Sequence, residues 1–327
     1  MALSARERLK HFYACFHSDD HVLVPINADP DAIACAWAVK RLLWRRTANV
    51  TISNVNIIDR PDNLALIRLI SVTITPFKKI NPEHYNRVVM VDSQPDHHDT
   101  LAALTPCVII DHHPVGPSHQ TCYQDIRPKY GATATILVEY LRAARIKPSV
   151  KLATALYYAI KTDTSNFERQ TLMEDINAFQ YVFRHANITL ARRIEHAEMR
   201  MDYLVYFRKA LSELRVRKER AYAHLGQVKH SDVCVQIADF LMRIEKINWT
   251  IVSGIYQERL VVIFRNDGIR KNAGLTAKNA FAEFGSAGGH KSAARAEMPL
   301  KALEAVVNPQ DPVKITRWII KHVEGKG

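Results

Sequence analysis

The stretch Cys107–Pro114, which reads CVIIDHHP, most constrains what this chain can fold into. Its first half is apolar and rich in β-branched residues, and a short run of this kind predicts a strand buried on both faces of a parallel sheet. The run stops at Asp111, His112 and His113. Ligands of an open α/β sheet bind at the carboxyl ends of its strands, so we expect these side chains to lie in a ligand crevice.

Burial of an acid and two imidazoles at a strand end costs free energy unless a metal ion or a charged partner satisfies them. The simpler interpretation of Asp111–His113 is an ordinary polar loop after a strand. A metal or phosphate site becomes the better interpretation only if other strands of the chain also end in acids or histidines.

The first predicted strand, His21–Ile26, is followed by Asp29 and Asp31 and then by a helix near 32–43 with good helix formers. Asp31 stands where an N-cap belongs, so helix capping alone could explain one of the two acids. A strand near 50–55 and a helix near 63–70 continue the alternation of strand and helix.

A third apolar strand, Arg87–Asp92, also ends in an acid, and Asp163 follows a predicted helix over 151–161. Several carboxylates at one edge of one sheet repel each other strongly unless cations lie between them. The pattern therefore predicts a cation site.

Two further features follow these strands. Asp96, His97 and His98 repeat the acid and imidazole triplet, but no strand leads into them, so we expect a solvated loop. A helix entered from Gly131 follows the central strand, and its N-terminal amides could bind a phosphate.

The part from 188 to 218 is predicted to be helical, is rich in Arg and Glu, and is interpreted as an interdomain linker. It would separate a domain over 1–187 from a smaller α/β domain over 219–327. Strands of the second domain are expected at the following positions: Tyr222–Leu225, Val233–Ile237, Trp249–Tyr256 and Leu260–Arg265.

The second domain carries a glycine cluster, Gly285–Gly289, followed by His290 and Lys291. Glycines allow the backbone to approach a ligand closely, and these two side chains together with Arg265 could bind phosphate. A structural turn is an equally good explanation of the cluster.

Length, composition and charge argue against several classes of protein for this chain. A chain of 327 residues suffices for two domains with a core in each. Its apolar runs are strand-sized and its start lacks a signal peptide, so we expect a cytoplasmic protein without a membrane span. Five cysteines without CxxC spacing argue against a disulfide framework or a zinc ribbon. The net charge of +12 favours polyanionic partners such as nucleic acid or nucleotides.

Taken in order, the motifs resemble the DHH phosphoesterase superfamily, in the two-domain branch with a DHH-associated C-terminal domain. That branch includes oligoribonucleases of the NrnA type, RecJ-like exonucleases and cyclic-dinucleotide hydrolases. The matching segments are PINADPDA at 25–32, Asp92, the name-giving triplet Asp111–His113, GATAT at 131–135, TDT at 162–164 and AGGH at 287–290.

The resemblance implies an α/β fold, with a parallel-sheet DHH domain, a helical linker and a smaller α/β substrate-binding domain. It also implies two Mn²⁺ ions, with Mg²⁺ as the alternative. They would share Asp92, with Asp29 on one ion and Asp31, His112 and Asp163 on the other. Asp111 and His113 would be catalytic, with His113 near the transferred phosphate. The substrate end would be held by Arg265, Gly288, Gly289, His290 and Lys291.

Two positions depart from the family pattern. The first-motif histidine, a ligand of the first metal, falls on Pro25, so the first site is expected to bind its ion weakly. His97 or His98 could replace that ligand, although a solvated loop is the simpler expectation. The triple-glycine start of the last motif is reduced to Ser286 and Ala287.

The function implied is metal-dependent hydrolysis of phosphate esters of short oligonucleotides or nucleotides, of the nanoRNase, 3′-phosphonucleotide phosphatase or exonuclease type. Short RNA, single-stranded DNA, a cyclic dinucleotide and a 3′-phosphorylated nucleotide stay open as substrates, and a homodimer stays open as the assembly. An inorganic pyrophosphatase fits less well, because its relatives lack the Gly-Gly-His type of C-terminal domain. The alternative from another class is a non-catalytic nucleotide or nucleic-acid binding module whose first metal site has decayed at Pro25.

Overall fold

The computed structural model describes residues 3–58, 60–117, 119–169, 171–196 and 201–325. The chain divides into two compact units, Met1–Glu198 and Met199–Gly327. This division falls inside the segment 188–218 that the sequence suggested as a linker, of which residues 197–200 lie outside the described part. Within the described part of the chain, no helix is long and apolar enough to cross a membrane.

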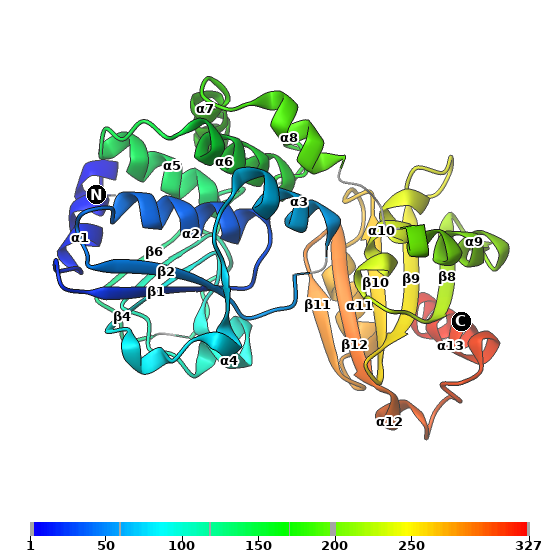
Figure 1. Cartoon of the computed structure of the whole chain (residues 1–327). Helices are drawn as coiled ribbons and strands as arrows, with labels where there is room; N and C mark the ends of the chain where they lie inside the picture. The colour runs from blue at the N-terminus through cyan, green and yellow to red at the C-terminus, as the bar shows by residue number, and fades with distance from the viewer. Residues whose placement is uncertain (1–2, 59, 118, 170, 197–200, 326–327) are drawn as a thin grey trace. The chain divides into compact units, whose positions relative to one another are not determined.

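The first unit is built on a six-stranded sheet in the order β3-β2-β1-β4-β5-β6 (Figure 1). All of its neighbouring strands pair in parallel. Its strands are β1 (His21–Ile26), β2 (Asn49–Asn54), β3 (Thr75–Pro76), β4 (Arg87–Val91), β5 (Val108–Asp111) and β6 (Tyr123–Ile126). Strand order reverses between β1 and β4, which is where an open α/β sheet places its ligand crevice. The predicted parallel sheet is confirmed.

The helices of the first unit are α1 (Ala5–Ala14), α2 (Pro30–Leu42), α3 (Pro61–Ile70), α4 (Asp99–Ala102), α5 (Thr133–Ala143), α6 (Val150–Asp163), α7 (Met173–Phe183) and α8 (Ile188–Glu195). Short 3-10 turns cover η1 (Phe77–Lys79), η2 (Pro82–His84) and η3 (Pro95–His97). Helices α1, α2, α5 and α6 pack on one face of the sheet in the main core. A smaller cluster around Met90, Leu101 and Ile109 fills the other face.

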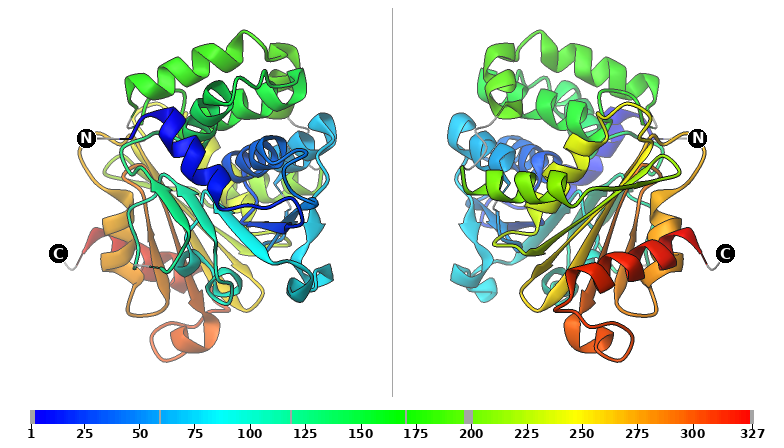
Figure 2. Two further views of the ribbon diagram at one scale, coloured as in Figure 1. Left: turned by 90° about the vertical axis from the view of Figure 1, so that its left-hand side faces the viewer. Right: turned by 90° about the vertical axis from the view of Figure 1, so that its right-hand side faces the viewer.

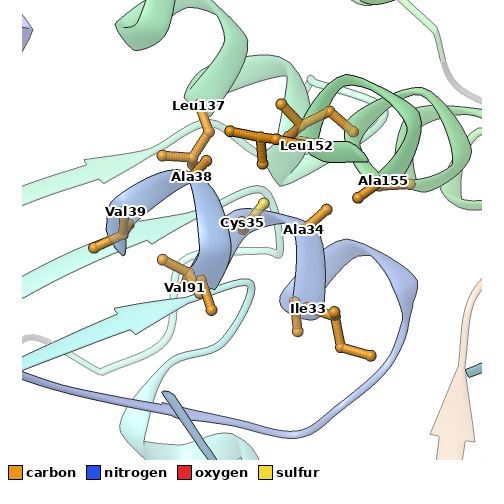
Figure 3. Close-up of a cluster of buried hydrophobic side chains, with 14 of the residues drawn as sticks. Ile33, Ala34, Cys35, Ala38, Val39, Val91, Leu137, Leu152 and Ala155 are labelled. Atoms are coloured by element: carbon orange, nitrogen blue, oxygen red, sulfur yellow. The ribbon is translucent and has the colours of Figure 1, made fainter. Parts of the chain in front are cut away.

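Helix α2 is the packing centre of this core (Figure 3). Its small residues Ala34 and Ala38 are fully buried and lie toward α5 and α6, represented by Leu137 and Leu152. Small side chains at these positions allow three helices to pack closely, so the N-terminal turn of α2 is fixed against the start of α5. That turn is capped by Asp29, whose Oδ1 accepts a hydrogen bond from the Ala32 amide. The expectation that Asp31 caps the helix is therefore wrong, because Pro30 already occupies its first position.

The second unit holds another six-stranded sheet, in the order β11-β12-β10-β9-β8-β7. Its strands are β7 (Arg215–Arg217), β8 (Arg220–Gln227), β9 (Trp249–Tyr256), β10 (Arg259–Asn266), β11 (Ser286–Gly289) and β12 (Ala293–Pro299). Its helices are the 3-10 turn η4 (Met201–Tyr203) and α9 (Leu204–Ser212), α10 (Asp232–Leu241), α11 (Ala273–Phe281), α12 (Leu300–Leu303) and α13 (Pro312–Glu324). Figure 2 shows α13, coloured red, running along one face of this sheet.

Two expectations for the second unit are wrong. The segment Val233–Ile237 is not a strand but part of α10. Its buried residues, which are Val233, Cys234, Ile237, Ala238 and Leu241, recur with helical spacing, and a short apolar run does not distinguish a strand from one buried helix face. The end of the expected helical linker is strand β7, an edge strand of only three residues, Arg-Val-Arg, which is too short to be predicted from its alternation.

Candidate metal centre

The acidic residues singled out in the first unit lie at the carboxyl ends of neighbouring strands. Asp29 and Asp31 follow β1, Asp92 follows β4, and Asp111 ends β5. Asp163 is the last residue of α6. The sheet order therefore brings together residues that are far apart in the sequence.

Two groups of three side chains have ligand atoms within 4.8 Å of one another. One group is Asp31, His112 and Asp163, and the other is Asp92, His112 and His113. His112 belongs to both groups because its Nε2 lies 3.0 Å from Oδ2 of Asp163 and 3.5 Å from Oδ1 of Asp92. These distances make His112 the centre of the cluster.

The start of helix α5 orients two of these carboxylates. The backbone amides of Thr133 and Ala134 donate to Asp31 at 2.7 and 2.9 Å, and the Thr133 hydroxyl donates to Asp92 at 2.9 Å. The sequence suggested that these amides bind a phosphate. That expectation is wrong, because the Asp31 carboxylate already occupies the positive end of the helix.

Asp92 has a left-handed backbone with φ of 55°. This conformation is uncommon for residues other than glycine, although Asp and Asn adopt it more readily than most. Asp92 is nearly buried, and its amide donates to the carbonyl of Ile110 in β5. The strand end is thus turned sharply while its carboxylate stays inside the cluster.

The residues of the name-giving triplet, Asp111–His113, have different hydrogen-bond partners. Asp111 is fully buried, and its Oδ1 accepts from Nδ1 of His113 at 2.8 Å while its Oδ2 accepts from the side-chain amide of Gln94 at 2.7 Å. The Nδ1 of His112 lies 3.1 Å from the carbonyl oxygen of Tyr130, which can only accept a hydrogen bond. Nδ1 of His112 therefore carries a proton, and Nε2 is the atom directed at Asp92 and Asp163.

Burial and mutual repulsion shift the proton affinities of the carboxylates. Burial, together with the charge of Asp163, raises the pKa of Asp29 to about 6 and that of Asp31 to about 7. Burial and the charges of Asp31 and Asp29 raise the pKa of Asp92 well above its usual value. A cation in their midst would remove this repulsion.

The pKa values of His112 and Asp111 shift in the directions that favour their charged forms. Burial alone would lower the pKa of His112, but the neighbouring Asp163 carboxylate raises it to about 10. Burial alone would raise the pKa of Asp111, but its hydrogen bonds from His113 and Gln94 lower it to about 2.

The residues fit a divalent metal ion. Oδ2 of Asp163 is buried without a hydrogen-bond partner of good geometry, although Nε2 of His112 is close to it. An unprotonated imidazole nitrogen and a carboxylate oxygen are both electron donors, so a proton or a metal ion must lie between them. Carboxylates with one or two imidazoles suit Mn²⁺ as ligands. Mg²⁺ also binds carboxylates but prefers sites with fewer nitrogen ligands.

The second acid and imidazole triplet is solvated as expected, since Asp96 and His97 are exposed, but it lies beside the cluster. Residues Pro95–His97 form a 3-10 turn, and the His97 ring packs edge-on against His113 with 5.2 Å between ring centroids. A third group of nearby ligand atoms consists of His97, Asp111 and His113. Nδ1 of His98 instead accepts from the Thr100 amide and caps α4. Of the two histidines, the structure thus brings only His97 to the cluster.

Two supporting residues were missed in the sequence. Asp175 of α7 is fully buried and accepts hydrogen bonds from the Gly131 amide and the Thr135 hydroxyl, which fixes the start of α5. Gln94 holds Asp111, as described above, and also accepts from the Gly116 amide. Asp175 does not follow a strand and Gln94 is not acidic, so a search for acids at strand ends could not find them.

Pro25 lies near the end of β1, where it is buried and pairs in register with Ser53 of β2. It has no side-chain donor, so the neutral ligand that the family motif would supply has no counterpart at this position. The prediction of a weaker first site stays a prediction.

The predicted phosphate-binding residues lie in the second unit. The edge strand β11 carries Gly288 and Gly289, and His290 and Lys291 follow it. Helix α11 begins against this turn, because the amides of Ala273 and Gly274 donate to the carbonyls of Lys291 and His290. A Cβ at Gly274 would lie 2.3 Å from the carbonyl oxygen of Gly289, so this close approach requires glycine.

Arg265 of β10 is already engaged. Its Nε donates to Asp239 at 2.7 Å, and an NH group donates to the carbonyl of Phe264. The guanidinium would have to share or leave the Asp239 carboxylate in order to bind substrate.

Comparisons with known proteins agree with this architecture. Residues 21–160 match the family described as the DHH family, N-terminal domain. An uncharacterized protein of Methanocaldococcus jannaschii is 33% identical over 301 residues, which is 92% of this chain and 62% of that protein. The chain thus spans less than two thirds of this relative's length.

Two solved structures show the same fold at low sequence identity. An exopolyphosphatase-related protein from Bacteroides fragilis is 16% identical, with a TM-score of 0.73 over 99% of this chain and 98% of that one. RecJ from Thermus thermophilus in complex with Mn²⁺ is 13% identical, with a TM-score of 0.54 over 98% of this chain and 55% of that one.

Proposed function

Because residues 21–160 match the DHH family, N-terminal domain, we propose that this chain is a divalent-metal-dependent phosphoesterase acting on short oligonucleotides or nucleotides. The observation that carries the proposal is the position of His112, whose Nε2 faces both Asp92 and Asp163. A cluster of carboxylates around one imidazole, with pKa values raised by repulsion, is suited to binding cations and not to supporting the fold.

The metal ligands would be Asp29, Asp31, Asp92, His112 and Asp163. When two divalent ions are bound, they stabilise the attacking and leaving oxygens of a displacement at phosphorus and make water acidic enough to react near neutral pH. Mn²⁺ is the metal we favour, because it accepts imidazole more readily than Mg²⁺ does. The structural relative RecJ was solved with Mn²⁺, which supports a divalent metal ion at this site.

The protein's own contribution is the orientation of these groups. Asp111 accepts the Nδ1 proton of His113, which fixes the ring beside Asp92, and Nδ1 of His113 is 3.9 Å from Oδ1 of Asp92. His113 would then donate from its other nitrogen to a phosphate oxygen. Thr133 holds Asp92 and Asp31 through its hydroxyl and amide, so both carboxylates stay in place as charge develops on the phosphate.

The substrate end would bind to the second unit through the glycines of β11 and the cations nearby. Gly288 and Gly289 would admit the phosphate close to the backbone, and His290, Lys291 and Arg265 would neutralise it. The net charge of +12 supports a polyanionic substrate. RecJ is an exonuclease by its description, which is in keeping with a nucleic-acid substrate.

The test is a substrate panel on metal-free protein with Mn²⁺ or Mg²⁺ added back. The panel contains short RNA, single-stranded DNA, a cyclic dinucleotide and a 3′-phosphorylated nucleotide. We expect release of mononucleotide or phosphate with at least one of them, and none from an Asp92→Asn variant. Nucleotide binding without turnover under every metal condition would instead favour the non-catalytic binding module.

A further inference from the structure

A basic cavity of about 590 Å³ lies in the second unit, beside the β7–β8 hairpin and the C-terminal part of α13. Five cations line it: Arg215, Arg217 and Lys218 from the hairpin, and Arg317 and Lys321 from the helix. Glu324 is the one acid among the lining residues. None of these residues belongs to the motifs discussed above.

The acid does not balance the cations. Glu324 lies 3.5 Å from Arg217 and accepts a hydrogen bond from the Tyr222 hydroxyl at 3.4 Å, so it is already engaged. Within the described residues, the other four cations have no ion-pair partner. Four unpaired positive charges around one cavity repel each other, and an anionic ligand would relieve that repulsion.

The cations are held in place by rigid elements. Arg317 and Lys321 are four residues apart on α13 and share its exposed side, while Trp318 and Ile319 anchor the helix in the core. Arg215 and Arg217 are two residues apart on β7 and share one face of that strand. The cavity therefore presents its charges without needing to order a loop.

The cavity and the glycine cluster lie at opposite edges of the sheet. Strand β7 is the last strand at one edge and β11 the last at the other, with four strands between them. At the usual strand spacing the two edges are about 24 Å apart. A mononucleotide or dinucleotide bound at the glycines would not reach the cavity.

We propose that this cavity binds the phosphodiester backbone of single-stranded nucleic acid, as a second contact for substrates longer than a few nucleotides. No aromatic ring is among its lining residues, so it offers no stacking surface and would bind without sequence preference. The inference rests on the proposed function for its choice of nucleic acid. The cavity's charge and rigidity do not depend on the metal centre.

The test compares two double variants of the full chain, each of which removes two positive charges. Arg317→Ala with Lys321→Ala alters the cavity, and Lys278→Ala with Lys301→Ala alters exposed lysines of α11 and α12, which do not line the cavity. Binding of labelled oligo(U), longer than about 16 nucleotides, is measured by fluorescence anisotropy in EDTA at several salt concentrations. EDTA removes divalent metal, so binding is read without hydrolysis.

We expect the cavity variant to bind oligo(U) about tenfold more weakly and to have a salt slope less negative by about 1.4, since each phosphate contact contributes about 0.7. The control variant should bind like wild type, and both variants should hydrolyse a dinucleotide with Mn²⁺ at the wild-type rate. Circular dichroism melting shows whether each variant is folded.

Equal affinities of the cavity variant and wild type would overturn the proposal, as would an equal loss in the control variant. Binding to phosphatidylserine vesicles that depends on Arg317, with no effect on oligo(U), would show that the ligand is a lipid surface and the proposal wrong. Each of these results leaves dinucleotide hydrolysis unaffected, so failure here is distinct from failure of the proposed phosphoesterase.

Discussion

Nε2 of His112 lies 3.0 Å from Oδ2 of Asp163, although strand β6, helix α5 and most of helix α6 separate the two residues in the sequence. The contact links the end of β5 to the end of α6, and Asp92 from β4 lies 3.5 Å from the same nitrogen. Nδ1 of His112 is held by the Tyr130 carbonyl, so the ring has one orientation. The His112 imidazole thus links the ends of three elements, β4, β5 and α6.

Replacement of His112 with alanine should abolish hydrolysis. Removal of a residue that orients a metal ligand typically costs ten- to a hundredfold in metal affinity or activity, so loss of the ligand itself should cost more than about a hundredfold. Asp163→Asn should behave alike, because it removes the charge and keeps the shape. Mn²⁺ binding by calorimetry and turnover are the measurements. His84→Ala, at an exposed turn, is the control, and near-wild-type turnover of either site variant would refute the assignment.

The contribution of Asp29, Asp31 and His112 to the stability of the metal-free protein should fall as the pH rises from about 4 to about 10. The pKa values of Asp29 and Asp31 are raised to about 6 and about 7, so between pH 4 and 7 the folded state binds more protons than the unfolded state. The pKa of His112 is raised to about 10, and the stability that its charge contributes is complete below about pH 6.5 and is lost as the pH rises through 10. All three groups act in the same direction.

Melting temperatures of EDTA-treated protein across this pH range test the prediction. Added Mn²⁺ should flatten the pH dependence and stabilise the protein most at alkaline pH, by about 2.7 kcal/mol at a hundredfold excess over the dissociation constant. A melting temperature of the metal-free protein that increases toward pH 9 would contradict the proton affinities described for the cluster.

Lys291 should matter more than Arg265 for substrate binding. Arg265 already donates to Asp239, whereas Lys291 follows the glycine strand β11. We expect Lys291→Ala to raise KM for a phosphorylated substrate and to make its salt slope less negative by about 0.7. Arg265→Ala should have the smaller effect on both. Steady-state kinetics at several salt concentrations would decide, and an unchanged KM for Lys291→Ala would exclude it from the substrate site.

The sequence was sufficient to predict the four central strands of the first unit's sheet and the acids that gather at their carboxyl ends, but not the edge strands β3 and β6. Strand-end acids such as Asp92 and Asp111 follow buried apolar runs, and parallel pairing forces their carboxyl ends together. Tertiary partners could not be predicted in this way. The amides that bind Asp31 lie about a hundred residues further along the chain, at Thr133 and Ala134. Asp175 acts through its contact with Gly131, which no local pattern reveals.

The errors in the second unit have a different origin. Helix α10 was predicted as a strand because its apolar residues are close together, and only packing against β9 and β10 decides between the two structures. Strand β7 is exposed, so it carries arginines where a buried strand would carry apolar residues.

His97 should act through His113 and not as a metal ligand. Its ring packs on the edge of the His113 ring, and its Nδ1 accepts from the Gln94 amide. We expect His97→Ala to lower kcat by about tenfold, in the lower range for loss of an orienting partner. The number of Mn²⁺ ions bound should stay the same. A lost ion in this variant, by calorimetric titration, would show instead that His97 supplies the ligand missing at Pro25.

Pro25→His should strengthen the first metal site. Pro25 is buried near the end of β1, where the DHH motif places a histidine, and the ring offers no donor atom to a metal. A histidine at this position would add a neutral imidazole to the carboxylates of Asp29 and Asp92, and we expect tighter binding of one Mn²⁺ ion by about tenfold or more. Pro25→Ala is the matched control, because it removes the proline ring without adding a ligand. Calorimetric titration separates the two sites, since only the weaker isotherm should shift. An unchanged isotherm in a folded Pro25→His protein would mean that the weak ion does not bind beside Pro25, and that Asp29 serves chiefly as the cap of α2.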